Sequence, residues 1–192
     1  MPSPNPKDSK TASVPKSEKA GLRREAREAA VQFLYQLDTP GSHPDTPDGD
    51  FWKLRSGSHD PDDPKSTAPP APLPQKARTF SETLIQGVQQ HRETLDEHIV
   101  RFTRNYQLGR IAAVDRNILR LAVYEMLHTP KVPLVVAINE AIEIAKKFGS
   151  EESGRFVNGI LDQIRTQVAQ PARKSAGTNP TETPDSNSTH DL

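Results

Sequence analysis

The chain has 192 residues, of which 33% are hydrophobic, 26% are charged and 18 are proline, and its 25 basic and 25 acidic side chains balance. This composition is too polar for one continuous globule, and the neutral balance argues against binding of nucleic acid through bulk charge. The absence of cysteine excludes disulfides, thiolate metal sites and cysteine nucleophiles, and no stretch approaches the roughly 20 apolar residues of a membrane span.

The prolines divide the chain, because 4 lie in residues 1–20, 9 in residues 39–75 and 3 in residues 169–192. We therefore predict a disordered basic tail over 1–20, a flexible Pro/Asp-rich insertion over 39–75 and a disordered tail over 169–192. Residues 22–38 and 76–168, which are 110 residues together, can enclose one hydrophobic core, so we expect a single helical domain over 21–168.

Within the insertion, Phe51, Trp52 and Leu54 form an apolar island. One helical turn capped by Asp50 would let this island dock on the core. The first 20 residues hold no apolar run of a signal peptide, so we expect a cytoplasmic protein.

Apolar residues recur at helical spacing through the rest of the chain, and no segment alternates with period two, which predicts an all-α fold, a single-domain helical bundle. The T-x-x-E spacing of Thr94 and Glu97 predicts a capping box that starts a separate helix. Residues 110–128 are apolar nearly all round and are expected to form the central helix. The expected helices cover residues 22–38, 75–91, 94 onward, 110–128, 133–148 and 150–168.

The last two expected helices carry start and stop signals. Pro133 suits a first helical turn, Gly149 stands where a left-handed cap is expected, and Ser150 can cap the last helix. Asn158 and Gly159 are unfavourable in a helix interior, which suggests a close helix crossing or a polar contact with the core.

Enzyme signatures are missing: the sequence has no Gly-rich phosphate loop, no H-E-x-x-H and no G-x-S-x-G. Glu125 and His128 form one E-x-x-H pair, but di-metal bundles need a second pair and further glutamates. We therefore expect no enzyme activity, no metal and no cofactor, with His128 near a helix C-terminus.

Residues 148–159 superficially resemble a helix-turn-helix, but a DNA-reading helix favours basic or amide side chains in its first turn. Glu151 and Glu152 would repel phosphates there, so we expect a structural corner or a protein contact and no specific DNA binding.

The first helix carries the strongest chemical pattern. At 100° per residue, Arg23, Arg27, Arg24 and Tyr35 fall within 120° of one another, opposite the apolar stripe. Arginine forks bind phosphate and a tyrosine ring stacks on an unpaired base, so the pattern is typical of single-stranded nucleic-acid binding. The alternative is a solvated face with helical ion pairs such as Arg24 to Glu28.

Three segments resemble the NusB family of bacterial transcription antitermination factors. They are RREAREAAVQFLYQLD (23–38), LGRIAAVDRNILRLAVYEM (108–126) and VPLVVAINEAIEIAKKFGSEESGRFVNGILDQI (132–164). The resemblance implies an all-helical, non-enzymatic protein that binds boxA RNA of ribosomal RNA operons together with ribosomal protein NusE. It also implies that this pair joins RNA polymerase and other Nus factors.

Matched position by position, the family's RNA contacts fall on Arg23, Arg24, Arg27 and Tyr35, and Phe156 is either an RNA contact or a core residue. Its NusE-facing carboxylates fall on Asp115 and Glu152. The family's usual third arginine is Glu25 here, so RNA affinity is either lower or partly supplied by Lys16 and Lys19. The insertion has no counterpart in the resemblance.

Two alternatives remain. The same helical module resembles the amino-terminal part of ribosomal RNA cytosine methyltransferases, which would require a separate catalytic subunit here. A structural adaptor that binds no RNA is the other. RNA titration with and without NusE distinguishes these hypotheses.

Overall fold

The computed structural model describes residues 16–39, 51–52, 55, 72–103 and 107–169. Within these ranges the chain is helical and contains no strand, which confirms the all-α prediction. The elements are α1 (Lys16–Leu37), α3 (Gln75–Gln90), α4 (Arg92–Phe102), the 3-10 turn η1 (Leu108–Arg110), α5 (Ala113–His128), α6 (Leu134–Phe148) and α7 (Ser153–Ala169). None of the described helices is long and apolar enough to cross a membrane.

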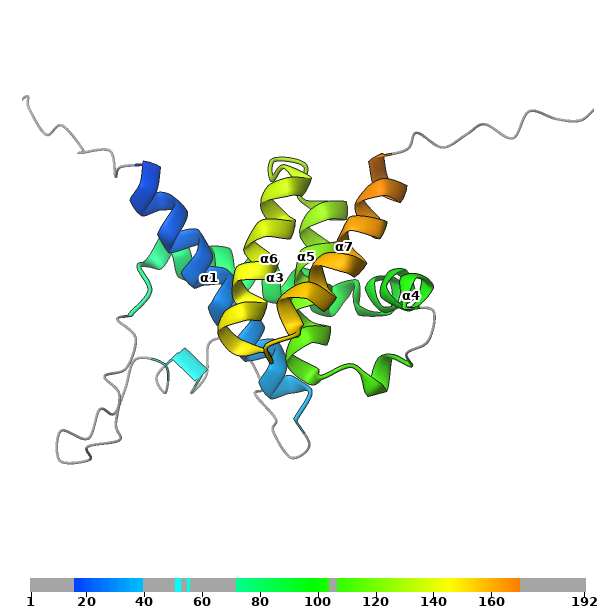
Figure 1. The fold of residues 1–192 in the computed structure, drawn as a ribbon. Coiled ribbons are helices and arrows are strands. Elements are labelled where there is room, and N and C mark those ends of the chain that lie inside the picture. Colours follow the sequence, from blue (N-terminus) through cyan, green and yellow to red (C-terminus); the bar gives the residue numbers. More distant parts are fainter. Residues whose placement is uncertain (1–15, 40–50, 53–54, 56–71, 104–106, 170–192) are drawn as a thin grey trace, which may run out of the picture.

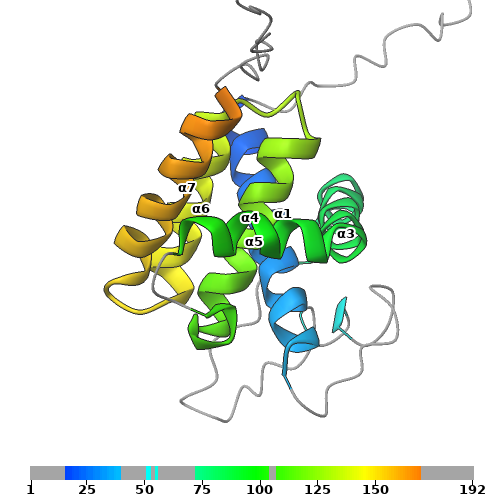
Figure 2. The ribbon, with the colours of Figure 1, turned by 90° about the vertical axis from the view of Figure 1, so that its right-hand side faces the viewer.

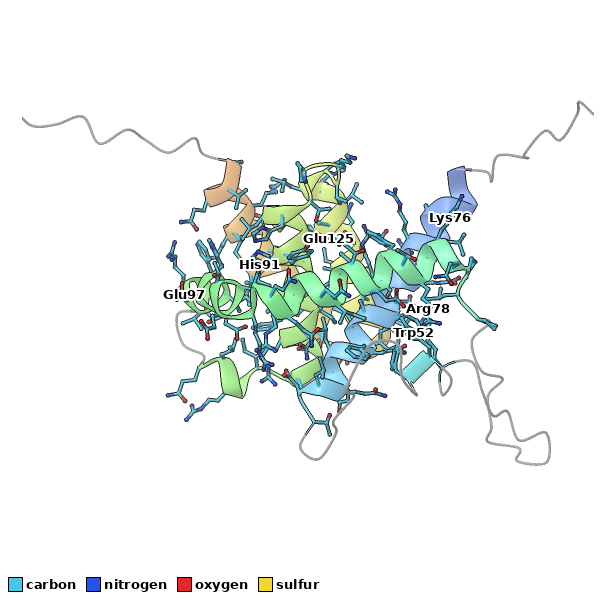
Figure 3. All side chains as sticks on the ribbon, turned by 180° about the vertical axis from the view of Figure 1, so that it is seen from behind. Trp52, Lys76, Arg78, His91, Glu97 and Glu125 are labelled. Carbon is cyan, nitrogen blue, oxygen red and sulfur yellow. The ribbon has the colours of Figure 1, made fainter. Side chains whose placement is uncertain are left out.

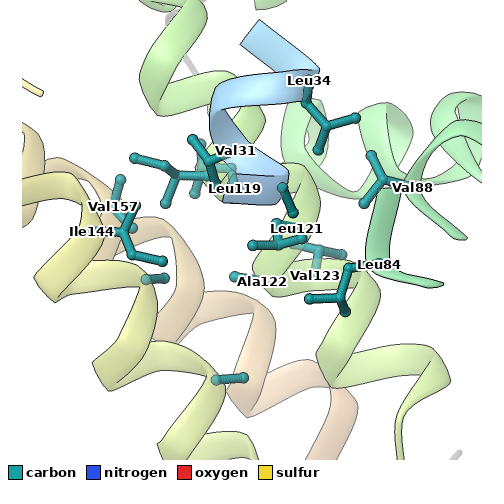
Figure 4. Packing of buried hydrophobic residues seen from close by; sticks show 14 of the residues in the cluster. Val31, Leu34, Leu84, Val88, Leu119, Leu121, Ala122, Val123, Ile144 and Val157 are labelled. Atoms are coloured by element: carbon teal, nitrogen blue, oxygen red, sulfur yellow. The ribbon is translucent and has the colours of Figure 1, made fainter. Parts of the chain in front are cut away.

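Helix α5 lies at the centre, as its apolar surface predicts. It packs against α1, α3, α4, α6 and α7 (Figures 1 and 2). Its side chains Ile118, Leu119 and Val123 are at most 1% exposed. Figure 4 shows residues of α1, α3, α5, α6 and α7 meeting in one hydrophobic cluster. The core is therefore a single layer of contacts around α5.

The start of α4 differs from the prediction. The helix begins at Arg92, and Thr94 lies exposed in its first turn. Backbone bonds run from His91 N to Gly87 O at 3.1 Å and from Leu95 N to His91 O at 2.9 Å, so helical bonding continues almost unbroken from α3. The His91 ring also contacts Gly87 O, with Nδ1 at hydrogen-bond distance, 2.9 Å. The predicted capping box is therefore wrong, because the helix start precedes Thr94.

The corner between α6 and α7 corrects two more expectations. Gly149 has φ of −92°, which is not left-handed. Glycine fits there because a Cβ atom would lie 2.4 Å from Ser153 Oγ and 2.7 Å from Ala145 O. Helix α7 starts at Ser153, and the Ser153 hydroxyl accepts a 2.8 Å bond from the Ser150 amide. Ser150 therefore precedes α7 by a full turn and does not cap its first residue.

Asn158 and Gly159 make neither of the contacts expected of them. Both residues are exposed, and a Cβ atom on Gly159 would meet nothing within 4 Å. The close helix approach lies instead at Gly87 of α3. A Cβ atom there would stand 2.0 Å from Tyr124 Cζ of α5.

Part of the insertion docks on the core. Phe51 and Trp52 are 7% and 6% exposed, and the Phe51 ring packs edge-on against Phe33 at 5.2 Å. The Arg78 guanidinium lies 5.1 Å from the Trp52 ring, a pair visible from behind in Figure 3. Docking of this island is confirmed for Phe51 and Trp52, whereas Leu54 lies outside the described residues.

The other predictions of disorder fall mostly outside the described residues. Helix α1 begins at Lys16, inside the segment 1–20 that the composition predicts to be disordered. The described helices therefore start five residues earlier than the predicted domain 21–168.

One carboxylate joins the C-terminal end of α1 to the starts of α4 and α5. We call Asp38, Arg92, Arg116, Asn117 and Arg120 the Asp38 cluster. Asp38 Oδ1 accepts from Arg92 at 2.8 Å, and Oδ2 accepts from Arg116 at 2.9 Å, Arg120 at 2.8 Å and Asn117 at 3.1 Å. Burial raises the pKa of Asp38, but the Arg116 hydrogen bond and the charge of Arg120 outweigh it, so the pKa lies below the ordinary 3.8.

The close approach at Gly87 gives a test of the packing. We expect Gly87→Ala to destabilise the protein by about 1 to 3 kcal/mol, because the Tyr124 ring must move to admit the methyl group. Gly159→Ala is the matched control and should stabilise by about 0.5 to 1 kcal/mol, since the site is open and helical. Urea unfolding of both variants checks this pair, and equal effects would contradict the packing described.

The Asp38 cluster predicts acid sensitivity. Because the folded-state pKa of Asp38 is depressed, its contribution to stability is present above pH 3.8 and is lost as the pH falls through the lower, folded value. Asp38→Asn should cost about 3 kcal/mol at pH 7 and flatten the fall in unfolding free energy below about pH 4. Urea unfolding from pH 7 to pH 2 measures both effects, with Glu97→Gln at an exposed site as the control.

Candidate nucleic-acid interface

The predicted arginine face of α1 divides into exposed and buried members. Arg23 is exposed, Tyr35 is 43% exposed, and the side chain of Arg24 is 44% exposed. Arg27 is only 3% exposed. The expectation of three solvent-facing guanidiniums is therefore wrong for Arg27, whereas the surface positions of Arg23 and Tyr35 are confirmed.

Arg27 lies between α1 and the central helix. Its Nε and Nη2 each donate at 2.8 Å to the two oxygens of Glu125, which is 1% exposed. The Phe80 ring of α3 covers the guanidinium at 5.5 Å, and Glu140 of α6 stands 3.8 Å from Nη1. A helical wheel gives the angle of Arg27 on α1 but does not show which other helices pack there. Here α3 contributes Phe80 and α5 contributes Glu125, and both contact the Arg27 side chain.

Arg24 is held by a carboxylate of α6. Its Nε and Nη2 donate to the Glu140 oxygens at 2.9 and 2.8 Å, and this hydrogen bonding raises the pKa of the guanidinium. The bidentate contact fixes the plane of the guanidinium, while its remaining Nη1 donors have no hydrogen-bond partner among the described residues. Glu140 therefore orients Arg24 and also neutralises part of its charge.

Arg23 is the less constrained cation of the pair. It forms no ion pair within the described part of the chain, and its guanidinium lies 5.8 Å from the Phe80 ring. The Phe80 ring thus contacts the guanidiniums of both Arg23 and Arg27. Further along, Lys147 of α6 bonds Glu28 at 2.7 Å, so the Arg24–Glu28 pair suggested by spacing does not form.

Tyr35 shares the angle of these arginines but not their position along the axis. It lies 12 residues beyond Arg23, about 18 Å at 1.5 Å per residue. A nucleotide strand that uses both groups must run along α1 and cannot meet them at one point.

The two carboxylates compared with a protein-binding site have different surroundings. Asp115 is 7% exposed, its Oδ2 accepts from Ser153 Oγ at 3.0 Å, and its Oδ1 is buried without a partner. Glu152 is exposed and pairs with Arg155 at 2.9 Å. Phe156 is half-buried against the core cluster. Only Glu152 is thus freely presented at the surface.

The E-x-x-H pair does not converge on one site. Glu125 binds Arg27, whereas the His128 ring packs 4.1 Å from that of His91 and 5.3 Å from that of Tyr124 (Figure 3 labels His91 and Glu125). Burial and the neighbouring His91 and His98 lower the pKa of His128. No group of three or more metal-binding side chains occurs in the described ranges.

The sequence gives little sign of the residues that organise this surface. Glu125, Glu140 and Phe80 reach α1 from three other helices. No motif singles out Glu140 or Phe80, and the E-x-x-H motif singles out Glu125 only as a metal ligand. A buried glutamate on an otherwise apolar helix was the one available signal, since such a charge requires a partner.

The pair of Arg27 and Glu125 predicts a large single-residue effect. Arg27→Ala should cost about 3 to 5 kcal/mol of unfolding free energy, because it leaves the Glu125 charge buried and unpaired. Arg23→Ala should change stability by less than about 0.5 kcal/mol.

The double variant Arg27→Met/Glu125→Leu should recover most of this loss, because both charges are then removed together. Urea unfolding measures all three variants. A loss below about 1 kcal/mol for Arg27→Ala would show that the pair does not join the helices.

Comparison with protein families matches residues 24–166 to the NusB family. "Transcription antitermination protein NusB" of Trichlorobacter lovleyi is 46% identical over 145 residues, which cover 75% of this chain and 90% of the relative.

Two solved structures share the fold. One is NusB of T. maritima, with 34% identity and a TM-score of 0.59 over 76% of this chain and 91% of that one. The other is a chain from a complex of the antitermination factors NusB and NusE with double-stranded RNA. It has 23% identity and a TM-score of 0.61, with 77% of this chain and 98% of that chain covered. On the family match and the identity to its relatives, this chain belongs to the NusB family.

Proposed function

We propose that this protein is a transcription antitermination factor that binds single-stranded, boxA-type leader RNA of ribosomal RNA operons together with ribosomal protein NusE. In this proposal it acts in the cytoplasm as a non-enzymatic adaptor and joins RNA polymerase with other Nus factors. The relatives' names support the role in antitermination, and the NusB and NusE complex with double-stranded RNA supports RNA and NusE as the binding partners.

The observation that carries the proposal is the pair of exposed guanidiniums and the exposed ring on one helix. Arg23 and Arg24 can each bind a phosphate, and Tyr35 offers a face on which an unpaired base can stack. The order of these groups along α1 fits a strand that runs parallel to the helix axis.

Arg27 has a different role in the proposal from its neighbours. A direct contact with RNA would require it to leave Glu125, with two 2.8 Å hydrogen bonds lost. We infer that Arg27 positions α1, and that Arg23, Arg24 and Tyr35 touch the strand. Phe156 and Glu152 stand at the α6–α7 corner, where the RNA end or NusE would approach.

Asp115 is assigned to the protein partner on different grounds from Glu152. Its buried Oδ1 lacks a donor, and a hydroxyl or amide of NusE would satisfy this oxygen if the Asp115 side chain moved toward the surface on binding. Glu152 offers an exposed charge to a basic side chain.

Titration with a labelled boxA-like RNA, with and without NusE, tests the proposal. Two phosphate contacts predict a slope of log affinity against log salt of about −1.4, from roughly −0.7 per phosphate. Arg23→Ala should reduce this slope by about 0.7, whereas Tyr35→Ala should weaken binding by about 1 to 3 kcal/mol and leave the slope unchanged.

Arg165→Ala provides the control, because Arg165 of α7 is 45% exposed and pairs with Asp162 away from α1. Absence of binding with and without NusE would favour a structural adaptor. Equal losses for Arg165→Ala and Arg23→Ala would place the RNA elsewhere.

A further inference from the structure

The Asp38 cluster leaves positive charge at the C-terminal end of α1. The Asp38 side chain is 4% exposed, while the Arg92 side chain beside it is 50% exposed. Arg110 ends η1 and is also exposed, and Arg116 donates to the carbonyls of Leu108 and Ile111 on either side of it. These contacts bring η1 and Arg110 close to the cluster.

The guanidiniums of this region are unevenly paired with carboxylates. Arg92, Arg110, Arg116 and Arg120 lie near Asp38 and Asp96, with exposed Glu93 next to Arg92 in sequence and buried Asp115 next to Arg116. Arg116 and Arg120 are largely buried and saturated with bonds to Asp38, Asp96 and backbone carbonyls. The exposed positive charge therefore belongs to Arg92 and Arg110. Arg92 donates to Asp38 through Nη2 only, so its other donors remain available.

Tyr35 lies one turn before Asp38, the carboxylate that binds Arg92. The Asp38 amide donates to Tyr35 O at 3.2 Å, and residues three apart share one face of a helix. Tyr35 is thus closer in sequence to the Asp38 cluster than to Arg23 and Arg24. The C-terminal end of α1 and the start of α5 meet at the bottom of Figure 1.

We propose that Arg92 and Arg110 form a second phosphate-binding surface, onto which a single RNA strand continues after Tyr35. This inference rests on the proposed function and extends it by two residues that belong to α4 and η1. Each end of α1 then holds phosphates, and the Tyr35 ring stacks on a base between them. An exposed cation beside an aromatic plane is the combination that favours unpaired RNA.

The geometry sets the length of RNA required. Arg23 and Asp38 are 15 residues apart, about 22 Å along the helix. At 3.4 Å per stacked nucleotide this distance takes about seven nucleotides. An RNA of about 15 nucleotides therefore reaches both surfaces, and one of about four nucleotides reaches only one.

The experiment compares Arg92→Ala/Arg110→Ala with Arg23→Ala/Arg24→Ala in the full chain. Both are titrated with a labelled single-stranded RNA of about 15 nucleotides over a range of salt. With four phosphate contacts in all, the unmodified chain should show a slope of about −2.8 on this RNA, instead of the −1.4 expected from Arg23 and Arg24 alone. Each pair of substitutions should weaken binding by about tenfold and bring the slope to about −1.4, since each removes two phosphate contacts. Arg92→Lys/Arg110→Lys should retain the slope, because the charge remains.

Two controls separate RNA binding from folding. Arg165→Ala removes a guanidinium of similar exposure, 45% against 50% for Arg92, and should have no effect. Arg110→Ala alone removes no ion pair of the described residues, so it should reduce the slope by about 0.7 with an unchanged melting temperature.

The outcomes distinguish this inference from the proposed function. If only the Arg23 and Arg24 variant weakens binding, the second surface is wrong and the proposed function stands. If neither variant does, both are wrong. If the Arg92 and Arg110 variant loses NusE while its RNA slope is unchanged, the surface belongs to the protein partner and the inference is overturned.

Discussion

The bidentate contact between Arg27 and Glu125 is the interaction on which the rest of this surface depends. It joins two helices whose residues are 98 positions apart, and both side chains are almost completely buried. A buried ion pair is stabilising only if both partners are in place, so the pair specifies one rotation of α1 about its axis. That rotation turns Arg23, Arg24 and Tyr35 outward. The exposed side chains of α1 are therefore oriented by a buried ion pair that RNA does not have to contact.

Electrostatic pairing also limits how strongly the surface can attract an anion. Glu140 accepts two hydrogen bonds from Arg24, and Glu28 forms an ion pair with Lys147. These contacts fix the side chains and lower the field that they project into solvent. With a net formal charge of zero, recognition would depend on a few well-oriented contacts rather than on long-range attraction. Such a surface suits a protein that binds RNA jointly with a partner.

Periodicity was sufficient to predict the helices, and the apolar surface of residues 110–128 was sufficient to predict the central one. Signals from single residues at helix ends predicted the helix caps less reliably. Thr94 has the sequence of a cap, but the backbone bonds through His91 start the helix earlier. Gly149 has the sequence of a left-handed cap, but side-chain crowding explains it. The burial of Arg27 could not be predicted, because its angle on a wheel says nothing of the carboxylate that arrives from α5. For the same reason, the contacts of Arg92, Arg116 and Arg120 with Asp38 could not be predicted from the sequence.

The long separation between Arg27 and Glu125 also has a consequence for the order of folding. Helices α5, α6 and α7 follow one another closely and can pack through local contacts, and α1 packs on α3 as well as on α5. The Arg27 side chain of α1, however, must wait for Glu125 of α5. At about 5 to 20 residues per second, roughly 5 to 20 seconds of synthesis separate the two residues. During this interval Arg27 has no Glu125 to bind, even where α1 can already pack on α3. The buried ion pair that sets the rotation of α1 therefore forms only once the central helix has been made.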